Sequence, residues 1–220
     1  MDTNTFNNLI SQTWPDLHAA STLGGGTFGT VYACTKTDAV TGVTQKEAVK
    51  VVRVDFTPED RANAEEEGIP FADYYRAVKE KRLQEIRWMV ALKSPHIVHI
   101  NGYTAIEEPD LSALYILIRM DCLTALDQLR TAHLDDTPEQ AAALAEKVAL
   151  DICDALRVCH QNGVLHRDIK PANILCSDAG DFYLGDFGIS KGTAQQASMT
   201  SSGTLEYAPR EVMTGQYDHR

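Results

Sequence analysis

The residues best suited to chemistry lie in one polar stretch, 164–175, and in a short motif that follows at 184–188. They offer Asp168, a carboxylate that can accept a proton, and Asn173 with Asp186, two oxygen donors of the kind that Mg²⁺ takes together with substrate phosphates. An ordinary polar loop would not need this ordered set at this spacing. We therefore favour phosphate chemistry that depends on a hard cation.

Two weaker signals precede these motifs. Gly24, Gly26 and Gly29 fit Gly-x-Gly-x-x-Gly, in which missing Cβ atoms let backbone amides approach phosphate oxygens, although a plain glycine-rich hairpin would look the same. The segment after Gly29 is typical of a strand and not of a helix, which excludes a dinucleotide-binding turn. Lys50 alone would be interpreted as a surface residue. Its place one strand beyond the glycines lets its ammonium reach phosphates held there.

The elements that must position these residues follow from hydrophobic periodicity and turn residues. Strands come first and helices later, which predicts an α+β fold with two segregated lobes. Residues 1–16 form an N-terminal extension with room for one short helix, and the acidic stretch 55–70 is expected to be a solvated loop. The expected strands are Ala19–Leu23, Thr30–Thr35, Ala48–Val54, Ile97–Tyr103 and Leu114–Arg119, and the expected helices are Phe71–Lys93 and Pro138–Gln161.

The helix over Pro138–Gln161 has the clearest signals. Thr137 is a natural N-cap, Gln140 completes a capping box and Gly163 ends the helix. One apolar stripe is predicted along it, formed by Leu144, Val148, Ile152, Leu156 and Cys159.

Composition narrows the class of protein. The 220 residues are 44% apolar and 23% charged, as in globular chains. The formal charge of −11 argues against nucleic-acid binding, which uses basic surfaces. The apolar stretch Leu111–Ile118 is too short to cross a bilayer, and Met1–Asn8 lacks the features of a secretory signal. The five scattered cysteines are typical of reduced thiols, so we expect a cytoplasmic location.

Taken together, the motifs resemble those of a eukaryotic-type Ser/Thr protein kinase catalytic domain, over about Leu17 to Arg220. The resemblance implies a two-lobed α+β fold, with a small antiparallel-sheet N-lobe over about 17–118 and a hinge over about 119–121. A mostly helical, partial C-lobe would occupy 122–220. The implied reaction transfers the γ-phosphoryl group of Mg-ATP to a Ser or Thr hydroxyl of a protein substrate.

The resemblance also implies roles for single residues. Lys50 would bind the α- and β-phosphates and be held by Glu85, which we prefer to Glu80 because of its spacing to the next strand. Asp168 would accept the substrate proton, and Asn173 and Asp186 would bind Mg²⁺. Lys170 and Thr204 would complete the catalytic set and favour a Ser/Thr acceptor. The implied nucleotide-binding set is Leu23, Gly24, Gly26, Phe28, Gly29, Val31, Ala48, Lys50, the gatekeeper Ile118, Met120, Asp121 and Asp186.

The last part of the chain carries further expectations. Arg167 before the catalytic carboxylate implies control by a phosphate on the loop hydroxyls of Thr193, Ser198, Thr200, Ser201 or Ser202. Pro209 lies one place earlier than in the family's motif, although Glu211 is where its glutamate belongs. Family members continue with further C-lobe helices beyond the position of Arg220, so we expect an incomplete C-lobe and little activity from these 220 residues alone. The alternatives are a catalytically weak, pseudokinase-like nucleotide-binding module and a small-molecule phosphotransferase of related fold.

Overall fold

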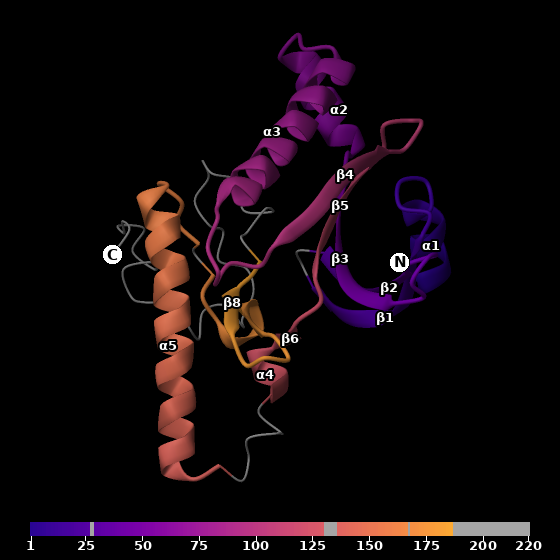
Figure 1. Ribbon diagram of the computed structural model, residues 1–220. Helices are drawn as coiled ribbons and strands as arrows, with labels where there is room; N and C mark the ends of the chain where they lie inside the picture. The colour runs from indigo at the N-terminus through magenta and orange to yellow at the C-terminus, as the bar shows by residue number, and fades with distance from the viewer. Residues whose placement is uncertain (27–28, 130–135, 167, 187–220) are drawn as a thin grey trace. The chain divides into compact units, whose positions relative to one another are not determined.

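The computed structural model describes residues 1–26, 29–129, 136–166 and 168–186 (Figure 1). The chain divides into two compact units. The first comprises Met1–Val90 and His99–Cys122, and the second comprises Ala91–Val98 and the described residues from Leu123 onward. The chain therefore enters the second unit after Val90, returns to the first at His99, and leaves it again after Cys122.

The first unit is built on a five-stranded antiparallel sheet with the order β1-β2-β3-β5-β4. The predicted strands are confirmed, and most are longer than expected. The strand placed near Ile97 begins only at Ile100, because Ile97 forms a bridge with Leu184 in the second unit's own fold. The strands are β1 (Leu17–Gly26), β2 (Gly29–Thr37), β3 (Thr44–Asp55), β4 (Ile100–Glu107) and β5 (Ala113–Asp121).

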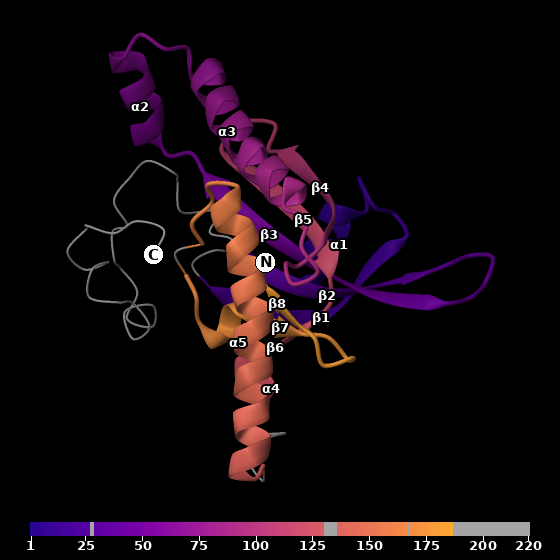
Figure 2. The ribbon, with the colours of Figure 1, turned by 60° about the vertical axis from the view of Figure 1, so that its left-hand side comes forward.

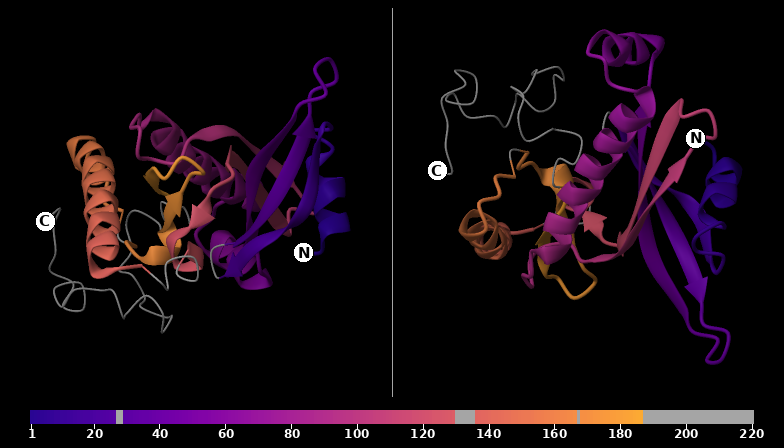
Figure 3. Two further views of the ribbon diagram at one scale, coloured as in Figure 1. Left: turned by 60° about the horizontal axis from the view of Figure 1, so that its bottom comes forward. Right: turned by 90° about the horizontal axis from the view of Figure 1, so that it is seen from above.

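One face of this sheet is covered by the N-terminal helix α1 (Thr3–Ile10) (Figures 1 and 3). Asp2 caps the helix by accepting from the backbone N–H groups of Asn4 and Thr5. Phe6 and Ile10 are fully buried in a core that also contains Leu17, Tyr32, Cys34, Val49, Val51 and Leu117. The N-terminal extension 1–16 therefore contains the one short helix for which the sequence left room, and this helix contributes to the core of the first unit.

The acidic stretch 55–70 is not the loop that we expected but contains a helix, α2 (Pro58–Glu66). Thr57 and Asp60 form a capping box, and Pro58 occupies the first turn. Backbone N–H groups at the start of the helix therefore have hydrogen-bond partners, although the sequence of the helix is polar. Arg61 donates to the carbonyl oxygen of Asp110 at 2.8 Å and lies 4.0 Å above the ring of Phe71. The expectation was wrong because it weighed charge alone and ignored this cap.

Helix α3 (Phe71–Ala91) packs against β4 and β5 within the first unit (Figure 2). The hydroxyl of Tyr75 donates to the carbonyl oxygen of Ala113 at 3.2 Å, and its ring lies 4.6 Å from that of Phe56. Lys79 pairs with Glu107 at the end of β4. The helix ends at Ala91, two residues before the expected Lys93.

The second unit combines helix α5 (Pro138–Gln161) with a three-stranded sheet of order β6-β7-β8. The bounds of α5, the capping box of Thr137 with Gln140, and the left-handed Gly163 after its end (φ +71°) are as predicted. The smaller elements are β6 (Thr124–Ala125), α4 (Leu126–Leu129), a 3-10 turn η2 (Pro171–Asn173), β7 (Ile174–Cys176) and β8 (Phe182–Leu184).

The predicted apolar stripe of α5 is only partly buried. Ile152 and Cys159 are buried, whereas Leu144, Val148 and Leu156 are half-buried among the described residues. Ala155, which the stripe did not include, is fully buried instead. The buried face of α5 therefore differs from the predicted apolar stripe, which was based on the helical period of 3.6 residues per turn.

All five cysteines are free thiols. Burial raises the pKa of Cys34 to about 12 and that of Cys159 to about 11, so both are held as unreactive neutral thiols. Within the described residues, no helix has both the length and the apolar character needed to span a bilayer.

Candidate active site

The glycine segment joins β1 and β2 in the first unit. The two strands pair as far as Gly26 and Gly29, and Gly29 has a φ of +117°. A Cβ atom at Gly29 would collide with the carbonyl oxygen of Val51, so no other residue fits there. A Cβ at Gly24 would meet nothing within 4 Å, so the backbone there is open to close approach.

Five of the expected nucleotide-binding residues share one face of this sheet. Lys50 on β3 lies opposite Val31 on β2 and Ile118 on β5, and Ala48 lies opposite Met120. Directly opposite residues point to the same face, and so do alternate residues of one strand. The face opposite to theirs carries Val49 and Val51 and is the one that α1 covers. The structure thus gathers these five side chains away from α1.

Two further parts of the expected nucleotide site, Leu23 and residues 119–121, lie toward the ends of strands. Leu23 lies at an irregularity of β1, between Thr22 and Gly24, and is 39% exposed. Residues 119–121, expected as a hinge, are still part of β5, because their pairing with β3 continues as far as Asp121.

The buried glutamate of α3 is Glu85, with 8% of its surface exposed. Its Oε2 accepts from Arg82 at 3.3 Å, while its buried Oε1 accepts no hydrogen bond within the described part of the chain. Burial raises the pKa of Glu85, and the positive charges of Arg82 and Lys81 oppose this. Glu80, the competing candidate, has a side chain that is 59% exposed and pairs with Arg87. Glu85 is therefore the carboxylate with capacity for a further cation.

In the second unit, three expected catalytic residues meet at one buried carboxylate. Asp168 and Asn173 are 5% and 4% exposed. The Lys170 ammonium lies 3.1 Å from Oδ2 of Asp168. The Asn173 amide nitrogen donates to the carbonyl oxygen of Asp168 at 2.8 Å and to its Oδ2 at 3.1 Å. The amide oxygen of Asn173 is thus the atom left to serve as a ligand.

Hydrogen bonds to backbone groups connect the loop that carries Asp168 to Gly185, the residue before Asp186. Nε2 of the buried His166 lies 2.8 Å from the carbonyl oxygen of Gly185, and Nδ1 accepts from the N–H of Asp168 at 3.3 Å. These partners assign the neutral tautomer with its proton on Nε2. The N–H of Gly185 donates to the carbonyl oxygen of Asn173 at 2.9 Å. Asp186 itself has a φ of +52°, a strained backbone state of the kind found at functional sites.

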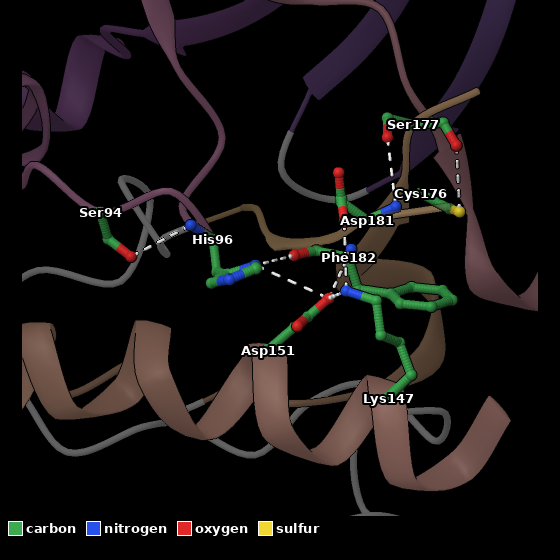
Figure 4. Close-up of polar contacts among 8 residues, drawn as sticks. All are labelled: Ser94, His96, Lys147, Asp151, Cys176, Ser177, Asp181 and Phe182. Carbon is green, nitrogen blue, oxygen red and sulfur yellow. Dashed lines mark hydrogen bonds and ion pairs between the residues drawn. The ribbon is translucent and has the colours of Figure 1, made fainter. Parts of the chain in front are cut away.

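A second group of contacts, which the sequence did not indicate, fixes β8 to α5 (Figure 4). Oδ2 of Asp151 lies 2.6 Å from the Lys147 ammonium and accepts from the N–H of Phe182 at 3.0 Å. Lys147 also reaches Asp181 at 3.1 Å. Nδ1 of His96 lies 3.0 Å from the carbonyl oxygen of Phe182 and 3.7 Å from Asp151. The strand β8, which leads to Asp186, is therefore held by hydrogen bonds from both α5 and the segment that contains His96.

Comparison with known proteins identifies the family. A family model described as "Protein kinase domain" matches residues 17–220. The chain belongs to the protein kinase family. This membership accounts for the two-unit α+β fold, with its antiparallel sheet in one unit and its long helix in the other.

Several curated protein kinases are similar to the chain. "Aurora kinase B" of Drosophila melanogaster is 36% identical over 141 residues, which cover 63% of this chain and 40% of that protein. "Aurora/IPL1-related protein kinase 2" of Caenorhabditis briggsae is 42% identical over 138 residues, or 63% of this chain and 43% of that protein. "Aurora kinase B" of Xenopus tropicalis is 27% identical over 221 residues, or 98% and 54%. The chain spans about half or less of the length of these kinases.

Several positions expected from the kinase motifs lie outside the described residues. Phe28 of the nucleotide-binding set, Arg167 and the catalytic candidate Thr204 are among them. The remaining ones are the loop hydroxyls of Thr193, Ser198, Thr200, Ser201 and Ser202, together with Pro209 and Glu211.

The contacts of Asp151 lead to a first prediction. Burial alone would raise the pKa of Asp151, but Lys147, the Phe182 N–H and His96 outweigh it and hold the pKa below the usual range. We expect Asp151→Asn to lower the free energy of unfolding by about 1–2 kcal/mol at pH 7, since a charged hydrogen bond becomes a neutral one and Lys147 is partly solvated.

The pH dependence follows from the direction of the shift. A carboxyl whose pKa is lowered by folding stabilises the protein fully above its unfolded pKa of about 3.9 and loses this effect as the pH falls through the folded value. The difference between the two proteins in urea unfolding should therefore shrink below about pH 4. Asp178→Asn, at an exposed site in the turn before β8, serves as the control and should change little. A difference that persists unchanged in acid would contradict this account.

Proposed function

We propose that the chain is the catalytic part of an ATP-dependent protein kinase that phosphorylates serine or threonine. The observation that carries the proposal is the buried carboxylate of Asp168, whose Oδ2 meets both the Lys170 ammonium and the Asn173 amide. The family match supports it, and so do the names of the similar proteins, which are kinases.

The proposed reaction uses Asp168 to orient and deprotonate the acceptor. As the Ser or Thr oxygen attacks the γ-phosphorus, the bond from that phosphorus to the β–γ bridging oxygen breaks and ADP leaves. The hydroxyl proton passes to the carboxylate of Asp168. Lys170, 3.1 Å from this carboxylate, supplies positive charge near the transferring group. Phosphoryl transfer needs alignment and charge neutralisation more than covalent catalysis, and these residues supply both.

For the nucleotide, we propose that the shared face of the first unit's sheet contacts ATP. Val31, Ala48 and Ile118 give this face an apolar character suited to a purine, and Lys50 supplies an ammonium for the phosphates. The open backbone at Gly24 and the obligatory glycine at Gly29 fit a loop that lies close to phosphate oxygens.

A divalent cation, which we propose to be Mg²⁺, would be held by Asn173 and Asp186. The residues fit this role: the Asn173 amide nitrogen is used in donating to Asp168, so its oxygen is the atom available as a ligand, and Asp186 offers a carboxylate. Hard cations prefer such oxygen ligands. When bound, the cation would offset negative charge on the phosphates.

We further propose a protein substrate and a cytoplasmic location. A protein is the acceptor that the name of one similar kinase suggests, and Lys170 in the catalytic motif favours a Ser or Thr residue on it. The five free cysteines are typical of a reducing compartment.

The test is transfer of labelled γ-phosphate to a generic protein substrate, with Lys50→Met as the decisive variant. We expect transfer by the unsubstituted protein and a loss of about 10²-fold or more in the variant, because electrostatic groups aimed at phosphates carry effects of that size. Lys46→Met is a matched control, since Lys46 lies on the same strand but is exposed. It should keep full activity.

Three outcomes would overturn the proposal. Near-normal turnover by Lys50→Met would show that the nucleotide assignment is wrong. ATP binding by the unsubstituted protein without any transfer would instead identify a pseudokinase-like module. Transfer to choline or an aminoglycoside in preference to protein would indicate a small-molecule phosphotransferase.

A further inference from the structure

Trp14 belongs to the N-terminal segment that precedes the matched kinase region 17–220, and its ring lies near Arg119 toward the end of β5. The guanidinium carbon of Arg119 lies 5.6 Å from the centre of the Trp14 ring. Nε of Arg119 also lies 2.7 Å from Oε2 of Glu47 on β3, in an ion pair whose side chains are largely buried. Arg119 is therefore in contact with both an aromatic ring and a carboxylate.

Trp14 is itself fixed in place. Its backbone N–H donates to the carbonyl oxygen of Ile10 at 2.7 Å, and its backbone carbonyl oxygen accepts from the N–H of Leu17 at 3.1 Å. Ile10 is fully buried in the core under α1. The position of the ring thus follows the docking of α1 on the sheet.

The backbone ladder beside Arg119 is irregular. β4 and β5 pair Ile100 with Met120 and Gly102 with Arg119, so Asn101 has no partner in the register. The Asn101 side chain bonds to Oδ1 of Asp121 at 3.1 Å instead. At this end of β5, a side-chain hydrogen bond therefore links β4 and β5 where the regular backbone pairing is interrupted.

The residues on either side of Arg119 belong to the proposed nucleotide face. Ile118 and Met120 lie opposite Lys50 and Ala48, so their side chains point away from the face that carries Arg119. A shift of Arg119 would move the backbone of both neighbours, because the three residues are consecutive in one strand.

We propose that Trp14 is a positioning residue for nucleotide binding: through Arg119 it holds the end of β5 in the geometry that binds ATP. The N-terminal segment then sets nucleotide affinity without touching the nucleotide. This inference rests on the proposed function, since it takes the face with Ile118 and Met120 as the ATP-binding one. The contact of Arg119 with the Trp14 ring is a cation–π interaction, whose strength depends on the aromatic ring.

The experiment compares Trp14→Ala with Trp14→Phe in the whole protein. The readouts are the Kd of a fluorescent ATP analogue, the KM for ATP and kcat at saturating ATP. Trp14→Ala should raise Kd and KM about five-fold, which corresponds to ~1 kcal/mol, and leave kcat within about two-fold. Trp14→Phe should restore most of the affinity because it keeps an aromatic face. Trp88→Ala, at a tryptophan of α3 that is 51% exposed, is the control and should leave Kd unchanged.

A second variant guards against a folding defect in Trp14→Ala. Arg119→Lys keeps the positive charge near Glu47 but loses the planar group that lies over the ring. It should weaken nucleotide binding to a similar degree, and combining it with Trp14→Ala should add little further loss. Additive losses would contradict the proposed coupling.

The outcomes separate the inference from the proposed function. Failure of the unsubstituted protein to bind nucleotide would overturn both. Normal binding by the unsubstituted protein, with an unchanged Kd in Trp14→Ala and only a lower melting temperature, would overturn the inference alone and leave Trp14 with a structural role.

Discussion

Asp168→Asn should lower the rate of phosphoryl transfer by about 10²–10⁴-fold while the Kd for ATP stays within a few-fold of its original value. The amide has the shape of the carboxylate, so the contacts of Asp168 Oδ2 with Lys170 and Asn173 are preserved in part. It cannot accept the proton of the acceptor hydroxyl. Single-turnover transfer of labelled phosphate measures the rate, and titration with a fluorescent ATP analogue measures the affinity.

The matched comparison is Asp186→Asn, at the other carboxylate of the proposed site. This variant should lose the Mg²⁺ dependence of nucleotide binding as well as the rate, because a carboxylate ligand of the cation is replaced. An equal loss of ATP affinity in both variants would refute the division of roles between Asp168 and Asp186.

Phe6→Ala should lower the free energy of unfolding of the first unit by about 3–5 kcal/mol, as removal of a fully buried aromatic ring does. The Phe6 ring stacks on Tyr32 with 3.9 Å between centroids and 6° between planes. Its loss leaves a cavity in the core under α1, next to Ile10. Urea unfolding followed by tryptophan fluorescence measures the effect, because Trp14 and Trp88 both belong to the first unit.

Asn8→Ala, at an exposed position of the same helix, is the control for this experiment. It should change the free energy of unfolding by no more than about 0.5 kcal/mol, as is usual for surface sites. A similarly small effect of Phe6→Ala would mean that α1 is not part of the core in solution.

The sequence was sufficient where the decisive interactions are local. The capping box at Thr137 and the stop at Gly163 involve neighbours along the chain, and the bounds of α5 followed from them. Asp168, Lys170 and Asn173 lie within one loop, so their spacing already implied that they meet. Helix α2 could have been found in the same way, because Thr57 and Asp60 repeat the pattern used for α5.

The sequence was not sufficient where segments far apart in the chain meet. The contacts of Asp151 with His96 and Phe182 join three such segments, and nothing in the spacing of these residues indicates them. The same holds for Trp14 and Arg119, which come together only because α1 docks on the face of the sheet that carries Arg119. The continuation of β5 through 119–121 also depends on long-range pairing, here with β3.

The Phe182 N–H donates to the Asp151 side chain of α5 and not to a neighbouring strand. This hydrogen bond couples the local unfolding of β8 to that of α5. Amide hydrogens exchange with solvent only when their hydrogen bonds break, and segments that open together form cooperative units. Exchange of this one amide for deuterium requires α5 and β8 to separate, whereas fraying of the short β7–β8 ladder would leave it protected. The long helix α5 and the strand β8 that precedes Asp186 are thereby expected to open together, and the exchange rate of the Phe182 amide proton reports that opening.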